Sequence, residues 1–318
     1  MTARRGSPTA ARAAVLALTG LALACLAFAG LSGCALDMKY GKYAIVYGVA
    51  NYQAGVSDLT YPDDDAAAMV SLLTSQGFQV WTETDAGATR NNLETLDVPA
   101  VAAAAQEDDL FVFYFSGHGG QGPAGAENSG GDGQDEYIYL YGSDWTVTGL
   151  PLTFSDDQLV DAFVDIKARK KVIILDSCNS GGFVGNALEA DGKPPSLTAG
   201  SEGLGTLLAR AIRLYANFDG SSADIPPWKA LVISAAGERE LSYEMGAPFN
   251  HGIFTYYLLE AAERGDRNGD GFVTVTEAFA HSQERVYRYW NLYYGYPTLQ
   301  FSPHVSGGPV DYVLFEAR

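Results

Sequence analysis

Apolar and amphipathic segments alternate along most of this chain. Five short runs are almost entirely apolar, as expected for strands that are buried on both faces of a parallel sheet. These runs cover residues 43–49, 77–81, 110–115, 171–175 and 230–234. Five longer segments repeat apolar residues at helical spacing, and they cover residues 63–75, 89–106, 154–167, 252–264 and 276–289. Strands that alternate with helices predict an α/β fold, in which a mostly parallel sheet carries helices on both faces.

One further segment has strand character. Residues 137–141 alternate tyrosine with Ile138 and Leu140, and they follow a glycine-rich loop. Aromatic and β-branched residues favour extended backbone, so this segment predicts a short hairpin on the edge of the sheet.

The N-terminal region has the composition of an export signal. Its first 33 residues contain three arginines and no acid, with an apolar stretch over residues 13–29. The segment ends in Leu31-Ser-Gly-Cys34, which resembles a bacterial lipobox, where the cysteine is diacylated and becomes the first residue after cleavage. The alternative is an ordinary signal peptide with an incidental cysteine. We expect an exported bacterial lipoprotein, anchored to a membrane through Cys34 in the periplasm or at the cell surface.

The expected organisation is a lipoprotein signal peptide over residues 1–33, a tether over residues 34–42 and one domain over residues 43–318. Loss of the signal peptide removes three of the 20 basic side chains and none of the 38 acids, which changes the formal charge from −18 to −21. Such a surface repels nucleic acid and attracts cationic peptides and divalent metals. No second apolar run approaches the roughly 18 residues that span a bilayer, and the sequence does not indicate an oligomeric state.

Two glycine-flanked motifs carry candidate catalytic side chains. Cys178 follows one apolar run within Asp-Ser-Cys-Asn-Ser-Gly-Gly, and His118 follows another within Ser-Gly-His-Gly-Gly. After export and lipidation Cys178 would be the single free thiol, which cannot form an internal disulfide and is therefore a candidate nucleophile. Both motifs come where a strand ends, and ligands of open α/β sheets bind beyond the carboxyl ends of the strands. His118 would take the thiol proton, and the amides of Gly119 and Cys178 would stabilise the oxyanion of acyl transfer.

These motifs belong to a wider resemblance. From about Tyr43 to Ser306 the chain resembles the caspase and metacaspase superfamily of cysteine peptidases, in particular its bacterial caspase-like members. The similar blocks are the segment 43–52 followed by Asp65-Ala66, the histidine block 116–119, the nucleophile block 176–178, and the later segments 252–260 and 300–302, which look like the family's later helix and closing strand. The resemblance implies a caspase-like fold and a Cys178/His118 dyad that cleaves peptide bonds in polypeptides, with no cofactor for catalysis.

The resemblance also implies a specificity pocket. In metacaspases the acidic residue two positions before the nucleophile and the aspartate of the Asp-Ala motif line the pocket for a basic P1 side chain, and these positions are Asp176 and Asp65 here. Two carboxylates would favour Arg or Lys and penalise acidic side chains. The alternative for Asp65 is a structural role, because Asp63, Asp64 and Asp65 open a helix whose dipole favours acids. The acidic segment 130–136 resembles a metacaspase loop and is expected at the rim of the cleft.

The sequence departs from the family in two places. Asn179 follows the nucleophile where metacaspases usually have histidine, and the Gln-Ala-Cys block of true caspases is absent, so cleavage after aspartate is not expected. Two other functions stay open. One is a legumain-like peptidase that prefers Asn, since that group also has a Ser-Gly-His-Gly block. The other is a noncatalytic caspase-like lipoprotein that binds calcium or a protein partner at the cell surface.

A second candidate site is the segment 266–277, which fits the twelve-residue calcium loop of an EF-hand. Gly271 lies where such a loop must turn sharply. The ion would be structural or regulatory. The alternative is an ordinary Asp-Gly turn with Thr276 as the N-cap of the next helix. The expected calcium ligands are Asp266, Asn268, Asp270, the Phe272 carbonyl, Thr274 and Glu277.

The other three histidines of the chain carry no recognisable motif. His251, His281 and His304 lack a second histidine at the spacing of metal ligands. We therefore expect all three to be surface or capping residues.

Overall fold

The computed structural model describes residues 40–53, 56–123, 134–143, 153–177, 229–236, 241–293, 299–306 and 311–317. The chain divides after Tyr40 into two units, and the unit Gly41–Arg318 contains all elements named below. The predicted signal peptide and Cys34 lie outside the described residues, and so does most of the tether. None of the described helices has the length and apolar character needed to cross a membrane.

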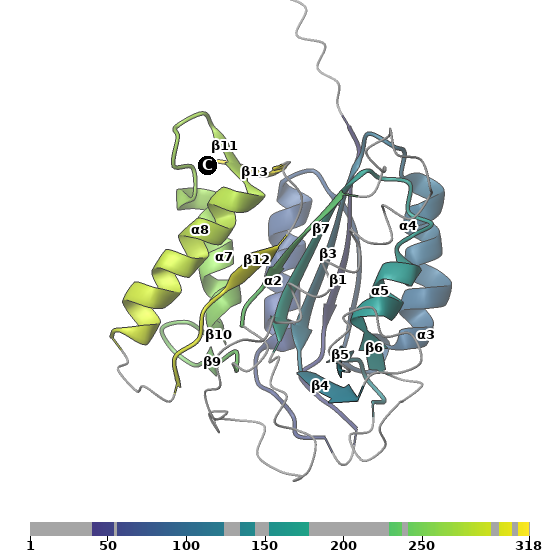
Figure 1. Cartoon of the computed structure of the whole chain (residues 1–318), viewed down its shortest axis with the longest axis horizontal. Helices are drawn as coiled ribbons and strands as arrows, with labels where there is room; N and C mark the ends of the chain where they lie inside the picture. Colours follow the sequence, from purple (N-terminus) through teal and green to yellow (C-terminus); the bar gives the residue numbers. More distant parts are fainter. Residues whose placement is uncertain are drawn as a thin grey trace, which may run out of the picture. The chain divides into compact units, whose positions relative to one another are not determined.

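A six-stranded sheet forms the centre of the unit Gly41–Arg318 (Figure 1). Its order is β12 (His304–Ser306), β8 (Lys229–Ser234), β7 (Lys170–Ser177), β3 (Leu110–Gly117), β1 (Lys42–Gly48) and β2 (Gln79–Thr84). All neighbouring strands are parallel except β12, which pairs antiparallel with β8 at the edge. The predicted parallel sheet is therefore confirmed, with a strand at each of the five apolar runs.

Helices cover both sides of this sheet, as predicted (Figure 1). One side carries α2 (Pro62–Ser75), α7 (Ile253–Arg264) and α8 (Val275–Arg285). The other side carries α3 (Arg90–Asn92), α4 (Val98–Ala104) and α5 (Asp156–Ala162). Three short turns complete the helical elements, and they are η1 (Asp85–Gly87) after β2, the π-helical turn η2 (Leu93–Asp97) between α3 and α4, and the π-helical turn η3 (Val286–Asn291) after α8.

Three small sheets accompany the central one. The first contains β4 (Gly119–Pro123), β5 (Gln134–Tyr139) and β6 (Thr153–Ser155), in that order. The second pairs β9 (Glu244–Met245) with β10 (His251–Gly252). The third pairs β11 (Phe272–Thr274) with β13 (Val313–Glu316).

Two predictions around the first small sheet need correction. The segment 137–141 belongs to an antiparallel hairpin, as predicted, but its strand pairs with β4 and β6 and does not lie on the edge of the central sheet. The helix predicted at 154–167 begins only at Asp156, because Phe154 is part of β6, where it pairs with Ile138 and its side chain is fully buried. Tertiary pairing therefore overrides the helical spacing of this segment.

The closing strand also differs from its predicted position at residues 300–302. It begins at His304. The backbone of Phe301 cannot join a strand ladder, because the Asn291 side chain bonds both its carbonyl (2.7 Å) and its N–H group (3.2 Å).

Alternation along the strands decides which side chains face which helices. Phe113 of β3 belongs to a hydrophobic cluster with residues of α4 and α5. Tyr114 points the other way, and its hydroxyl lies 2.6 Å from Oγ1 of Thr255 in α7. Ser116 and Asp176 share the orientation of Tyr114, so they project toward α2 and α7 at the carboxyl ends of β3 and β7.

Candidate active site

The carboxyl ends of β3 and β7 lie side by side. In the parallel pairing of these strands, Gly117 is in register with Ser177. His118 follows Gly117 in the chain and Cys178 follows Ser177, and neighbouring strands of a sheet are about 4.8 Å apart. Cys178 itself lies outside the described residues, so its contact with His118 stays a prediction.

His118 is buried and held by the loop that follows β1. Its backbone N–H donates to the Tyr52 hydroxyl (2.8 Å), and its ring lies 4.8 Å from the Tyr52 ring. Its Nε2 atom lies 2.8 Å from the Ser57 carbonyl oxygen. A side chain at Gly117 would disturb this arrangement, because a Cβ atom there would lie 2.7 Å from the Tyr52 hydroxyl. Neither Tyr52 nor Ser57 was predicted, since no motif marks a loop contact.

The Ser57 carbonyl decides which nitrogen of His118 is a base. A carbonyl oxygen only accepts hydrogen bonds, so Nε2 carries the proton and Nδ1 carries the lone pair. Burial lowers the pKa of His118 to about 4, while the bond to Ser57 and the charge of Asp58 oppose this shift. The imidazole is therefore neutral at neutral pH and able to accept a proton.

Gly119, the predicted oxyanion-hole residue, opens β4. It pairs with Ile138 of β5, and the neighbouring His118 carbonyl accepts a hydrogen bond from the Tyr139 N–H group (3.0 Å). The small sheet therefore fixes the backbone on both sides of the His118–Gly119 peptide bond. A fixed amide is what oxyanion stabilisation requires.

The two predicted pocket carboxylates come together next to His118. Asp65 of α2 accepts from the Ser116 hydroxyl (3.0 Å), and both of its oxygens lie within 3.2 Å of the Gly252 nitrogen. A Cβ atom built on Gly252 would overlap with Oδ2 of Asp176 and lie 2.9 Å from Oδ2 of Asp65. The two carboxylates thus flank one point, and only a glycine fits at position 252.

Asp176 is surrounded by neutral donors. Its Oδ1 accepts from the Ser242 hydroxyl (2.5 Å), and its Oδ2 accepts from the Thr255 hydroxyl (2.6 Å) and N–H group (3.1 Å). Burial is the main cause that raises the pKa of Asp176 to about 6, and the nearby charge of Asp65 adds to it. Burial also raises the pKa of Asp65, although its hydrogen bond to His251 opposes the shift.

His251 is not the surface or capping residue that we predicted. Its Nδ1 atom lies 2.8 Å from Oδ1 of Asp65, and its side chain is 22% exposed. The prediction failed because the contact between His251 and Asp65 depends on the position of the two-residue strand β10 against α2. A strand this short has no recognisable pattern in the sequence.

Asp65, Asp176 and His118 line one small cavity of about 40 Å³. One water takes about 30 Å³ of the liquid, so the cavity has room for about one water. The segment 242–244 contributes one wall. Glu244 fixes this segment, because its carboxylate accepts from the N–H groups of Thr60 (2.7 Å) and Tyr61 (3.0 Å). A Lys or Arg side chain is larger than this cavity, so its entry requires the cavity to widen.

Ser177 lines the same cavity and is buried. Within the described part of the chain, Ser177 Oγ is the single buried side-chain polar atom that lacks a hydrogen-bond partner. An unpaired buried hydroxyl costs about 1–3 kcal/mol. A bound group that pairs with this hydroxyl would recover that cost.

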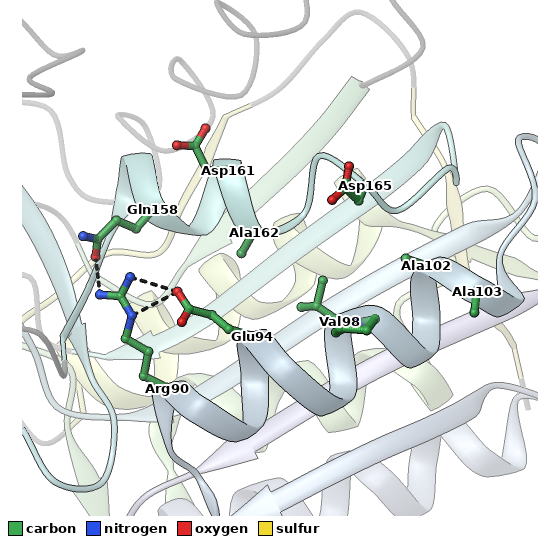
Figure 2. Close-up of a pocket in the computed structure, with 10 residues that line it drawn as sticks. Arg90, Glu94, Val98, Ala102, Ala103, Gln158, Asp161, Ala162 and Asp165 are labelled. Atoms are coloured by element: carbon green, nitrogen blue, oxygen red, sulfur yellow. Dashed lines mark hydrogen bonds and ion pairs between the residues drawn. The ribbon is translucent and has the colours of Figure 1, made fainter.

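A larger cavity of about 790 Å³ lies between α4 and α5 and shares no lining residue with the His118 cavity (Figure 2). Its cation, Arg90, is already paired with Glu94 (2.8 Å) and Gln158 (3.1 Å). Among the described residues that line this cavity there is no histidine, cysteine, serine or threonine. Its described lining therefore offers no thiol or hydroxyl nucleophile and no imidazole base.

The predicted calcium loop forms a tight turn between α7 and α8. Asp266 accepts hydrogen bonds from the N–H groups of Gly269 (2.7 Å) and Gly271 (3.0 Å). These bonds, with the one from Gly271 as the main cause, hold the pKa of Asp266 below its usual value. Gly271 has a φ of 88°, which favours glycine. The strand at the end of the loop, β11, is fixed by its pairing with β13.

Glu277, the last predicted calcium ligand, serves the helix that follows. Thr274 is the N-cap of α8 and forms a capping box with Glu277. The prediction of Thr276 as N-cap is wrong, because the Thr276 hydroxyl bonds Asp311 instead. In the described ranges, no three acidic, histidine or cysteine side chains converge in a way that would hold a metal. Calcium binding therefore stays a prediction.

Comparison with known proteins decides the family. The family model of the caspase domain matches residues 41–303, which is most of the chain. This chain belongs to the caspase-domain family. The match spans all predicted residues of the dyad and of the pocket, and it confirms the resemblance and the caspase-like fold.

Solved structures similar to this caspase-domain protein include one from a bacterium. The crystal structure of protein GSU0716 from Geobacter sulfurreducens has a TM-score of 0.54 and 23% sequence identity, and the similarity covers 87% of this chain and 99% of that chain. At this identity the likeness supports the fold alone. No curated protein matches the chain.

Proposed function

We propose that this caspase-domain protein is a cysteine endopeptidase that cleaves polypeptides after Arg or Lys. Cys178 would be the nucleophile and His118 the general base. The observation that supports this most is that His118, Asp65 and Asp176 line one cavity. That cavity lies where the strands before His118 and Cys178 end in register.

The proposed reaction begins when Nδ1 of His118 takes the proton of the Cys178 thiol. The thiolate attacks the scissile carbonyl carbon, and the electron pair of the C=O π bond moves to oxygen, where the amides of Gly119 and Cys178 stabilise it. His118 then gives its proton to the leaving amine as the C–N bond breaks, which leaves a thioester. Water, deprotonated by His118, attacks the thioester, and the thiolate leaves and recovers the proton.

The preference for a basic P1 residue follows from the charges of the cavity. None of the described residues that line it is Lys or Arg, whereas Asp65, Asp176 and Glu244 are acidic. A cation that enters would pair with two buried carboxylates, where charge-assisted hydrogen bonds are strong. An acidic P1 side chain would add a further negative charge to an already acidic site with few waters, which is strongly unfavourable.

A panel of peptides that differ only at P1 tests this function. Hydrolysis after Arg and Lys by the wild type, and not by Cys178→Ala, supports it. Hydrolysis after Asn alone would make the protein legumain-like. If no peptide is cleaved while calcium or a protein partner still binds, the noncatalytic alternative is favoured. Hydrolysis after Asp would contradict the assignment of Asp65 and Asp176.

We also propose that the protein is a lipoprotein anchored through Cys34. The support is the sequence Leu-Ser-Gly-Cys after an apolar stretch. In a bacterial expression host, the wild type is expected to incorporate labelled palmitate and to sediment with membranes. Cys34→Ala is expected to lose the label. Equal labelling of both proteins would contradict lipidation at this residue.

We further propose that the loop 266–277 binds calcium, which would join the end of α7 to the start of α8. The backbone N–H bonds that hold Asp266 within the loop support this, and so does the turn at Gly271. Asp266, Asn268, Asp270, Thr274 and Glu277 would supply side-chain oxygens and Phe272 its carbonyl.

Calcium is expected to raise the melting temperature. A ligand at about 100 times its Kd stabilises a protein by about 2.7 kcal/mol, which is about 5 °C for a chain of this size. Asp270→Asn should lose most of this shift, whereas Asp108→Asn, an exposed acid outside the loop, should keep it. Differential scanning fluorimetry in calcium and in EGTA measures both, and equal melting temperatures in the wild type would exclude the site.

A further inference from the structure

The pocket carboxylate Asp65 has an ionisable partner outside the cavity. His251 of β10 does not line the cavity, yet its Nδ1 atom lies 2.8 Å from Oδ1 of Asp65. The next residue, Gly252, adds a backbone N–H bond to the same carboxylate. The His251 side chain is 22% exposed to solvent, whereas the Asp65 side chain is only 1% exposed. The imidazole is therefore reachable by solvent protons, and the carboxylate is not.

Two buried carboxylates that flank one point cannot both ionise without a compensating cation. The donors to Asp176 are the neutral groups of Ser242 and Thr255. Apart from His251, the donors to Asp65 are also neutral, namely the Ser116 hydroxyl and a backbone N–H. Among the described contacts of this carboxylate pair, His251 is therefore the one group that becomes a cation when it is protonated.

We propose that His251 is a positioning residue that keeps both carboxylates of the pocket ionised at neutral pH, by supplying from outside the cavity the positive charge that the pair requires. This inference rests on the proposed function, because it explains how the pocket stays ready for a basic P1 side chain. Asp65 and Asp176 can then both accept hydrogen bonds from an ammonium or guanidinium group. Without His251, Asp65 and Asp176 would share one proton, and the protonated carboxyl group would have one oxygen fewer to accept a hydrogen bond from the substrate.

The pKa of His251 is raised, because the acids around it outweigh its partial burial, which acts in the opposite direction. From α2 these are Asp64 and Asp65, and from β7 Asp176, whose charges raise the pKa of His251 together with the Asp65 hydrogen bond, which is the largest cause. From α7 the Tyr256 ring lies 6.5 Å from the imidazole. On β9, Glu244 pairs with the neighbouring Gly252. None of these described groups is a cation.

His251→Asn is the decisive variant, because asparagine keeps an N–H donor and removes the charge. For Arg and Lys peptides, kcat/KM relative to the wild type is expected to be about 0.1 at pH 7 and to approach 1 by pH 9, where the shared proton leaves. The loss should appear mainly in KM. A peptide with citrulline at P1, which is neutral, should give a ratio that does not change with pH. His281→Asn is the matched control. His281 also contacts a carboxylate, that of Glu260 on α7 (3.4 Å), and neither residue lines the cavity.

A pH-independent ratio for basic peptides, or the same change with citrulline, would overturn the inference while the proposed function stands. A wild type without any preference for Arg or Lys would overturn the proposed function itself. NMR titration of the wild-type imidazoles gives a readout that needs no activity. His251 is expected to titrate above the usual histidine value of about 6.5, and to return toward it in Asp65→Asn. A His251 that titrates at or below that value in the wild type would contradict the inference.

Discussion

Cys178→Ala is expected to lower kcat/KM for every peptide substrate by at least about 10⁴-fold, which is about 5.4 kcal/mol of transition-state stabilisation. Alanine removes the sulfur that forms the thioester, and the described part of the cavity contains no second thiol. Its hydroxyls belong to Ser116, Ser177, Ser242 and Tyr243. A serine hydroxyl is a much poorer nucleophile at neutral pH without a base tuned for it.

His118→Ala is the matched comparison for this variant. Residues that act as one catalytic unit give losses that do not add. The kcat/KM of the double variant is therefore expected to lie within about threefold of the kcat/KM of the slower single variant. Initial rates with an Arg peptide measure all three proteins. Fully additive losses, or activity that survives Cys178→Ala, would remove Cys178 and His118 from a common mechanism.

Asp176→Asn is expected to lower kcat/KM for Arg and Lys peptides by about 10²–10³-fold, or about 3–4 kcal/mol, because it leaves the substrate cation with one partner fewer in a buried site. A peptide with a neutral P1 side chain should lose far less. Asp97→Asn is the matched control. Asp97 is also buried, and burial raises its pKa as well, but its carboxylate contacts Tyr47 instead of the cavity. Equal losses in the two variants would show that the effect of Asp176 is structural.

The protonation of Asp176 is expected to make both hydrolysis and stability depend on pH. Asp176 is ionised above its pKa of about 6, so hydrolysis after Arg and Lys should fall as the pH drops through that value. Stability should respond in the opposite direction. Because folding raises this pKa from 3.8 to about 6, Asp176 favours the folded state most below pH 3.8 and loses that contribution as the pH rises through 6. Asp176→Asn should therefore flatten both profiles, which rate measurements and urea unfolding between pH 4 and 8 would test.

Much of the fold follows from the sequence, because a parallel sheet buries both faces of its strands and makes each strand a continuous apolar run. β3 and β7 are buried along nearly their whole length, and both were predicted. The segment 154–167 was harder, since Phe154 has a place in both a helical and an extended pattern. Its partner Ile138 decides between them, and that partner is distant in the sequence.

The capping error had a local signal. Thr274 and Glu277 have the spacing of a capping box, Thr-x-x-Glu, which identifies Thr274 and not Thr276 as the N-cap. Both residues also fall at ligand positions of the predicted calcium loop. A glutamate that ends a loop and opens a helix serves both descriptions.

The active-site residues divide in a similar way. His118, Asp65 and Asp176 lie in motifs and were predicted. Ser57 and His251 were not, because one contributes only a backbone carbonyl and the other reaches Asp65 through tertiary structure, 186 positions along the chain. Such supporting groups form no motif in the sequence, although they influence the protonation states of the motif residues His118 and Asp65.

In the proposed enzyme, the Cys178 nucleophile acts beside a cavity in which Asp65 and Asp176 select a cation. The most direct test is the ratio of kcat/KM for two peptides that are identical except for arginine or its neutral analogue citrulline at P1. In the wild type this ratio is expected to be at least about 100, which corresponds to about 2.7 kcal/mol, and in Asp176→Asn it should fall by at least tenfold, to about 10 or less. A ratio near 1 in the wild type, or a large ratio that Asp176→Asn leaves unchanged, would contradict the account.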